Sequence, residues 1–251
     1  MDEGPGASGS DERAVPTPPW RTPPRAGRRR ITREEIIDAA LVVLERDGAD
    51  ALTTRAVAQQ MRTGPASLYA HVAGKGELLE LVVDRVIGEM PEPPQARPPV
   101  WADQLRQMCR DTRAALLVHP GIAAVALGTP PGGPHALHRT ECLLAVLRAG
   151  GLPDRVAALA LDLFSQYVVA SAFEADLRRR ASGAGSEWPA ELERYFSSLS
   201  RDRFPHTVQL AAQLTRPAED ERFEFGLDVL IAGLHSLTDV PGLGDLTPGP
   251  G

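Results

Sequence analysis

The chain has 251 residues, a formal net charge of −6 and 43% hydrophobic residues, so it can fill the core of one large domain or two modest ones. Aromatic residues make up only 5% while leucine, alanine and valine dominate, and this balance favours helix over sheet. The N-terminus has no charged segment followed by an apolar core, which argues against a secretory signal. Prolines divide the long uncharged run at residues 114–138 into pieces too short to cross a bilayer. We therefore predict an all-α, cytoplasmic protein that does not enter a membrane.

Both ends of the chain are rich in proline and glycine. Residues 1–30 contain six prolines and four glycines, and residues 239–251 contain three prolines and four glycines. Such segments bury too little apolar surface to offset the entropy of ordering, so we expect a disordered arm and a flexible tail. The arm ends in Arg28, Arg29 and Arg30, which either lie along a nucleic-acid backbone or minor groove or only solubilise the arm.

The first helix is predicted to begin at Thr32. Thr32 and Glu35 have the spacing of a capping box, and Ile31 and Ile36 have that of a hydrophobic staple. An apolar stripe at helical spacing follows, and Gly48 provides the stop.

A short helix, a turn and a second helix are predicted next. The short helix runs from the Thr53 cap to about Met61, residues 62–64 form the turn, and Pro65 opens the following helix at a position where its missing N–H is not needed. The large aliphatic residues of this last helix, Leu68 and Val72, are four residues apart and share one face. The opposite, outer face is therefore small and polar. This is the helix-turn-helix pattern, although a solvated helical hairpin inside a bundle has a similar one.

The helix-turn-helix segment stays positive within an acidic chain. Residues 51–76 contain no Asp or Glu but include Arg55, Arg62 and Lys75. A protein that enters a DNA groove keeps carboxylates away from the phosphates, and a helix with a narrow outer face fits a major groove about 12 Å wide. The charge pattern therefore favours double-stranded DNA as a partner.

The rest of the chain is predicted to be helical as well. A helix that starts near residues 74–76 ends before Pro91, and the proline-rich residues 91–99 form a stiff connector. Further helices are predicted at about residues 100–118, 121–128, 134–149, 153–180, 188–199, 206–215 and 218–237. The helices at 153–180 and 218–237 carry more apolar surface than one small bundle covers, which indicates an interface with a second copy.

The sequences LTTRAVAQQM and GPASLYAHVAGKGELL resemble the N-terminal domain of the tetracycline-repressor (TetR) family of bacterial transcription regulators. The resemblance extends over about residues 31–81, and FEFGLDVLIAGLHSL, residues 223–237, resembles the last helix of the tetracycline-repressor subgroup. It implies a helix-turn-helix DNA-binding domain at residues 31–76 and an effector-binding and dimerisation domain at residues 77–238. It also implies a homodimeric repressor that binds a palindromic operator and is released by a small-molecule effector.

The family pattern implies DNA contacts for eight residues: Thr54, Arg55, Pro65, Ala66, Ser67, Tyr69, His71 and Lys75. In that pattern Arg55 meets a guanine, and a guanidinium can bridge guanine O6 and N7. His71 and Lys75 meet phosphates, and the others meet phosphates, base edges or methyl groups. The operator sequence does not transfer, because Ala70 replaces a large aromatic residue and Arg62 replaces a turn glycine.

An effector pocket is expected in the larger half. The metal-binding histidine of the tetracycline repressor falls at Ala126, and the other drug-contacting positions, apart from Thr129, lack the expected polar or aromatic groups. Tetracycline with magnesium is therefore not expected as the effector, no cofactor is expected, and the pocket should be apolar and suit a hydrophobic molecule. The residues that would line it, each of which would also suit an ordinary core, are Trp101, Met108, Thr112, Thr129, Phe164, Tyr167 and Phe173.

No catalytic or metal site is predicted. The chain lacks P-loop and GxSxG motifs and a nucleophile paired with a base, which argues against an enzyme. His135 and His138 are three apart but have no HExxH or CxxC framework for zinc or iron. Cys109 and Cys142 fit reduced core thiols better than a redox switch. The open alternative to a ligand-responsive repressor is a dimeric DNA-binding module with a general, architectural role and no inducer.

Overall fold

The capping box predicted at Thr32 is present in the computed structural model of the chain. The Thr32 hydroxyl accepts a hydrogen bond from the Glu35 N–H at 3.2 Å, and the Glu35 carboxylate accepts one from the Thr32 N–H at 3.1 Å. Two backbone donors that a helix start would leave unsatisfied are thereby bonded. The helix ends at Gly48, whose φ of 86° lies in the left-handed region that favours glycine.

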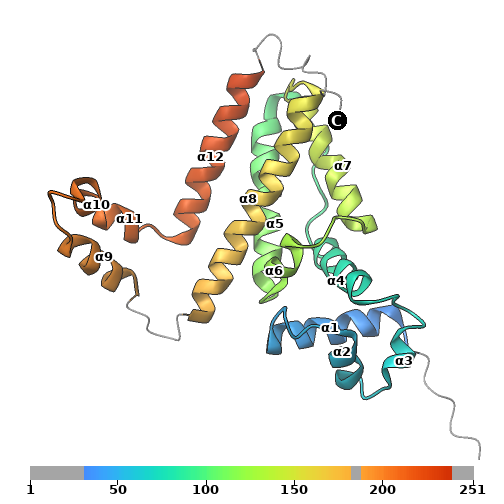
Figure 1. Cartoon of the computed structure of the whole chain (residues 1–251). Helices are drawn as coiled ribbons and strands as arrows, with labels where there is room; N and C mark the ends of the chain where they lie inside the picture. Colours follow the sequence, from blue (N-terminus) through green and yellow to red (C-terminus); the bar gives the residue numbers. More distant parts are fainter. Residues whose placement is uncertain (1–30, 182–187, 239–251) are drawn as a thin grey trace, which may run out of the picture. The chain divides into compact units, whose positions relative to one another are not determined.

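The structure describes residues 31–181 and 188–238, and within these residues it is helical with no strand, which confirms the all-α prediction. The proline-rich arm with its three arginines and the C-terminal tail lie outside the described residues. The elements, shown in Figure 1, are α1 (Arg33–Asp47), α2 (Thr54–Gln60), α3 (Pro65–Leu68), α4 (Lys75–Gly88), the 3-10 helix η1 (Pro98–Val100), α5 (Trp101–Val118), α6 (Ile122–Leu127), α7 (Pro134–Ala149), α8 (Asp154–Ala181), α9 (Trp188–Ser198), α10 (Pro205–Gln209), α11 (Ala211–Thr215) and α12 (Glu219–Leu237).

Two predicted helices differ from the observed structure. The helix that opens with Pro65 is expected to include Val72, but α3 ends at Leu68, and the His71 N–H donates to the Leu68 carbonyl at 2.8 Å in the turn that follows. The segment at residues 206–215 is two short helices, α10 and α11, instead of one. Leu210, with φ −101° and ψ 12°, leaves helical geometry and interrupts the run of backbone bonds. The two short helices and α9 pack mainly against one another.

The first four helices form a small bundle with its own core. α1 packs against α2 and α4, and α2 packs against α3. The centre of this bundle is made of fully buried aliphatic side chains from all four helices, including Ile36, Leu44, Val57, Leu68 and Leu78. α4 also contacts α5, α6 and α7, so it belongs to the packing of both halves of the protein.

The larger half is built around α8. This helix packs against α5, α6, α7 and α12. It is long and apolar enough to cross a membrane, with a mean hydropathy of 1.6, but these neighbours place it as the central helix of a helical domain (Figure 1). The core around it holds Leu105, Leu147, Phe164 and Leu227, each at most 1% exposed.

α8 and α12 approach closely at Gly226. The Tyr167 hydroxyl lies against this glycine and donates a hydrogen bond at 2.8 Å to the carbonyl oxygen of Phe223. The Tyr167 and Phe223 rings stack with centroids 5.6 Å apart. A Cβ atom at position 226 would overlap the Tyr167 hydroxyl, so the absence of a side chain there permits this helix contact.

Candidate DNA-binding surface and effector cavity

The turn between α2 and α3 is held by local hydrogen bonds. The Thr53 hydroxyl caps α2 by accepting from the Ala56 N–H at 3.1 Å, and the Thr63 N–H donates to the Ala58 carbonyl at 2.9 Å. Arg62 has a φ of 52°, the one positive value among the described residues other than glycine. This left-handed conformation is the one that the turn glycine of the family pattern would adopt without strain.

All eight residues expected to contact DNA have solvent-accessible side chains. Arg55, Pro65, Ala66, Tyr69 and Lys75 are exposed, and the other three, Thr54, Ser67 and His71, are half-buried. They come from the first turn of α2, from α3 and the turn after it, and from the start of α4. The Thr54 and Tyr69 hydroxyl oxygens are 3.4 Å apart, which joins the start of α2 to the end of α3.

The cations on this surface are free to bind an anion. Arg55, Arg62 and Lys75 form no ion pair with another described residue. Arginines elsewhere in the small bundle are paired, as in the ion pair between Arg33 and Glu77 at 2.8 Å. A cluster of uncompensated positive charges without a carboxylate is what a polyanion such as DNA requires.

A second set of contacts fixes the segment between α3 and α4. The Arg33 guanidinium on α1 donates both to the His71 carbonyl at 3.1 Å and to the Glu77 carboxylate at 2.8 Å. The Glu77 carboxylate also accepts from the Ala73 N–H. These bonds hold the backbone on which His71 and Lys75 lie in a defined position relative to α1.

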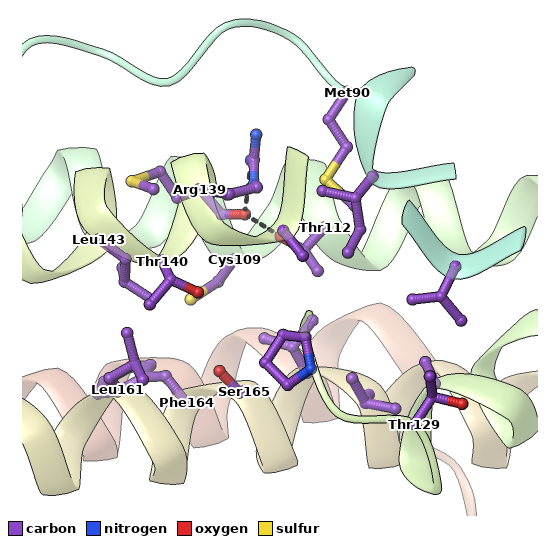
Figure 2. A pocket seen from close by; sticks show the side chains of 18 residues that line it. Met90, Cys109, Thr112, Thr129, Arg139, Thr140, Leu143, Leu161, Phe164 and Ser165 are labelled. Atoms are coloured by element: carbon purple, nitrogen blue, oxygen red, sulfur yellow. Dashed lines mark hydrogen bonds between the residues drawn. The ribbon is translucent and has the colours of Figure 1, made fainter. Parts of the chain in front are cut away.

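The larger half contains a cavity of about 210 Å³ between α4, α5, α6, α7 and α8. Its walls are mostly aliphatic, aromatic and thioether groups, and Figure 2 shows α7 and α5 on one side of the space and α8 on the other. Val83 and Ile87 of α4 are among the lining residues. A helix of the small N-terminal bundle therefore also forms part of the cavity wall.

Four of the seven residues expected to line an effector pocket line this cavity: Met108, Thr112, Thr129 and Phe164. The other three do not line it. Two of them, Trp101 and Tyr167, pack against other helices instead. Trp101 is buried against Gly150 and the ring of His235, and Tyr167 is bonded to α12. Phe173 is half-buried further along α8 and does not reach the cavity. Ala126, at the position of the missing metal-binding histidine, does line it.

Several lining residues were not predicted from the sequence: Met90, Pro131, Arg139, Thr140 and Ser165. One signal could have found part of this set. Ala136, Thr140 and Leu143 lie four and three residues apart, which places them on one face of α7. Leu161, Ser165 and Val168 show the same spacing on α8. Pro131 has no such signal, because it lies between α6 and α7 and only packing brings it to the cavity.

The charged and polar groups at the cavity are largely occupied. The Thr112 and Thr129 hydroxyls each donate to the carbonyl four residues earlier, at 2.8 Å. Burial raises the pKa of the Cys109 thiol to about 12, so this thiol stays protonated. Burial also lowers the pKa of the Arg139 guanidinium, with Asp111 acting in the opposite direction. Arg139 donates to the Pro91 carbonyl at 3.1 Å.

A histidine connects the two halves of the protein near the end of α4. The His119 ring lies between two carboxylates, with Nδ1 3.1 Å from Glu45 on α1 and Nε2 3.0 Å from Glu89 at the end of α4. Two residues further on, the Gly121 N–H at the start of α6 donates to the buried Asp176 carboxylate of α8 at 2.9 Å. The start of α6 is thereby tied to α1, α4 and α8.

The two cysteines are free thiols, Cys109 buried and Cys142 half-buried. The His138 ring contacts the Glu92 carboxylate at 2.9 Å and the Cys142 sulfur at 3.8 Å. Among the residues that the structure describes, no three His, Cys, Asp or Glu side chains are grouped as metal ligands would be.

Comparison with known proteins gives matches to both halves. Residues 36–82 match the family model of bacterial regulatory proteins, tetR family, and residues 91–238 match that of the tetracyclin repressor-like, C-terminal domain. The HTH-type transcriptional repressor DrrR1 of Streptomyces coeruleorubidus is 32% identical over 222 residues, which are 86% of this chain and 82% of that protein. The class G tetracycline repressor protein of Vibrio anguillarum is 30% identical over 213 residues, 83% of this chain and 95% of that protein.

Solved structures agree with these matches. ActR of Streptomyces coelicolor in complex with actinorhodin has 40% sequence identity and a TM-score of 0.76, and the match covers 84% of this chain and 99% of that one. The matches to both family models agree with the observed structure. It has a helix-turn-helix segment near the N-terminus and a helical domain with a cavity between α4 and α8. The chain therefore belongs to the TetR family of bacterial DNA-binding regulatory proteins.

Proposed function

We propose that this protein is a homodimeric repressor that binds a palindromic operator in the cytoplasm and is released from it by a small, hydrophobic effector. The observation that carries the proposal is the position of α4. This helix begins at Lys75 in the DNA-binding surface and contributes Val83 and Ile87 to the cavity wall. A ligand that changes the packing around these two side chains acts directly on the helix that supports the DNA-binding bundle.

The free cations define the roles that we propose at the DNA. Arg55, exposed and unpaired among the described residues, reads a guanine in the major groove, where a guanidinium can form two hydrogen bonds. Pro65, Ala66 and Ser67 on α3 lie along base edges and methyl groups, and Thr54 and Tyr69 contact phosphates or base edges. His71 and Lys75 bind phosphates, and Lys75 adds charge at a helix N-terminus.

The exposed apolar side chains of α8 and α12 support a second copy as partner. Leu159 and Leu163 are 61% and 45% exposed, and Phe225 and Val229 are 71% and 54% exposed. Each pair is four residues apart and so lies on one helix face. Burying the faces of both helices against the same faces of a second chain gives a two-fold dimer. Its recognition helices would meet half-sites about 34–36 Å apart.

The effector works by a difference in affinity. It needs to prefer the conformation that does not bind DNA by only about 1–3 kcal/mol, the usual size of a coupling energy, to release the operator measurably. Met108, Thr112, Thr129 and Phe164 are the predicted lining residues that we propose to contact it. The complexes of ActR with actinorhodin and with (S)-DNPA support a small organic molecule as the effector, and Ala126 offers no ligand for a metal chelate.

The test is fluorescence anisotropy of the purified protein against DNA duplexes that tile the region upstream of its own gene. It is run at two salt concentrations with excess competitor DNA. We expect tight binding to one palindromic duplex that survives the competitor, because base contacts add to the phosphate contacts. Uniform, salt-sensitive binding to every duplex would overturn the operator proposal and favour a general, architectural DNA-binding module.

A further inference from the structure

Two hydroxyl groups of the cavity have no hydrogen-bond partner among the described residues. Thr140 on α7 and Ser165 on α8 both line the cavity, and Figure 2 shows their hydroxyl groups directed into the space between the two helices. Neither hydroxyl hydrogen-bonds another residue within the described part of the chain, whereas those of Thr112 and Thr129 bond carbonyls of their own segments. Thr140 and Ser165 can therefore donate to or accept from a ligand.

Among the described lining residues, no charged group faces these hydroxyls. The one ionic side chain of the lining is Arg139, and Figure 2 shows its guanidinium directed away from the space between Thr140 and Ser165. It is engaged with the carbonyls of Pro91 at 3.1 Å and Met108 at 3.4 Å. The Cys109 thiol, with a pKa raised to about 12 by burial, is neutral. A charged ligand would lose its hydration here without gaining a counter-ion, which is strongly unfavourable.

The size and the walls of the cavity indicate the shape of the ligand. An engineered apolar cavity of about 150 Å³ takes up benzene, so a cavity of about 210 Å³ suits a molecule about two fused rings in size. Met90, Met108 and Phe164 line it. Thioether sulfur and phenyl rings both pack favourably on an aromatic ring.

We propose that the cavity takes an uncharged, bicyclic aromatic molecule whose hydroxyl or carbonyl group hydrogen-bonds Thr140 and Ser165. This inference deepens the proposed function, because it names the chemical class of the effector. The binding step itself does not depend on DNA, so it is tested on the free protein. A failure of ligand binding is therefore distinguishable from a failure of operator binding.

The experiment is isothermal titration calorimetry at pH 7 with three probes that share one ring system: 2-naphthol, naphthalene and 2-naphthoate. We expect 2-naphthol to bind most tightly, with the anionic naphthoate more than about tenfold weaker because its charge has no partner. Thr140→Val and Ser165→Ala should each weaken 2-naphthol by about two- to tenfold, the effect of one neutral hydrogen bond, and leave naphthalene unchanged.

The control is Thr215→Val, since the Thr215 hydroxyl donates to the Ala211 carbonyl at 2.9 Å and Thr215 does not line the cavity. This variant should keep the preference for 2-naphthol over naphthalene. Circular dichroism melts confirm that each variant is folded. Tighter binding of naphthoate than of 2-naphthol would overturn the inference and point to an Arg139 that turns inward. An equal loss in Thr215→Val, or no binding of any probe, would overturn the inference too. The anisotropy assay without ligand would still decide the operator proposal independently.

Discussion

The Nδ1 atom of His119 lies 3.1 Å from a carboxylate oxygen of Glu45, so the residue that ends α5 contacts the first helix of the DNA-binding bundle. The Nε2 atom of the same ring lies 3.0 Å from Glu89, at the end of α4. A neutral imidazole has only one N–H, so both hydrogen bonds form only when His119 is protonated. The connection between the two halves therefore depends on the charge of this ring.

The first prediction concerns the pH dependence of stability. Burial, the largest single influence on the pKa of His119, lowers it, but the hydrogen bonds and charges of Glu89 and Glu45 together raise the pKa above its ordinary 6.5. A raised folded-state pKa means that the stabilisation is fully present below about 6.5 and is lost as the pH rises through the folded value. For Glu89, burial raises the pKa, but hydrogen bonds from His119 and Arg85 outweigh it and lower the pKa below its ordinary 4.5.

The contribution of the Glu89 carboxylate to folding stability is thus present above pH 4.5. It is lost as the pH falls through the pKa of Glu89 in the folded state. The joint stabilisation is largest between about pH 4.5 and 6.5. His119→Gln should lower the melting temperature most in this window. The decline of the melting temperature from pH 6.5 upward should also be smaller in this variant than in the wild-type protein. Thermal melts over a pH series measure both effects. His138→Gln is the control, because the His138 side chain is 55% exposed and its pair with Glu92 lies on the surface. A His119→Gln curve parallel to the wild-type curve would contradict the protonated bridge.

Arg55→Ala should relax specificity. The side chain is exposed at the start of α2 and has no ion-pair partner among the described residues, so its loss disturbs no internal contact. We expect a loss of about 1–3 kcal/mol in binding free energy and a weaker preference at one base pair of each half-site. Anisotropy titrations against operators substituted one base pair at a time measure this. An unchanged specificity profile would remove Arg55 from the base contacts.

Lys75→Ala should act differently, because we propose that this lysine, at the start of α4, binds a phosphate and not a base. Affinity should fall by a similar factor for every duplex, and the slope of log K against log salt concentration should decrease by roughly one. Arg46→Ala is the matched control, since this exposed arginine is already paired with Asp47 at 2.7 Å outside the acid-free segment. Loss at some sequences but not others would speak against a phosphate contact.

Gly226→Ala should destabilise the protein. The added methyl group overlaps the Tyr167 hydroxyl and displaces it from the Phe223 carbonyl, and overpacking of this kind costs about 1–3 kcal/mol. Gly76→Ala in α4 is the control, because a Cβ atom there would meet no other atom within 4 Å. Alanine is the better helix former at that position, so it should be neutral or slightly stabilising. Chemical denaturation that gives equal free energies of unfolding for both variants would contradict this contact.

Much of the fold could be predicted because its signals are local. The capping box of Thr32 and Glu35, the proline that opens α3 and the helical spacing of aliphatic residues each act within a few residues of the chain, and the structure has the corresponding helices. The acid-free segment and its motif led to the TetR resemblance, which the comparisons confirm. The roles of single residues at the DNA stay predictions.

The cavity depended on long-range packing instead. Met108 and Thr112 line it as expected, yet Tyr167, an equally plausible aromatic residue, turns to α12 because Gly226 lets its hydroxyl reach a backbone carbonyl. Thr140 and Ser165 lie on opposite sides of the cavity, on two helices whose sequences do not indicate that they face each other. Which face of each helix points inward follows from periodicity, but which faces meet is set by the packing of all of them together.

The sequence by itself determined the helices, their caps, the positive helix-turn-helix segment and the family, because each rests on neighbouring residues or on a contiguous motif. Only the tertiary structure decided that His119 lies between Glu45 and Glu89, that α4 serves both halves, and which hydroxyls face the cavity. The His119 contacts join residues 30 and 74 positions apart. Hydrogen-bond geometry over such separations is fixed by the folded chain as a whole and not by local preference.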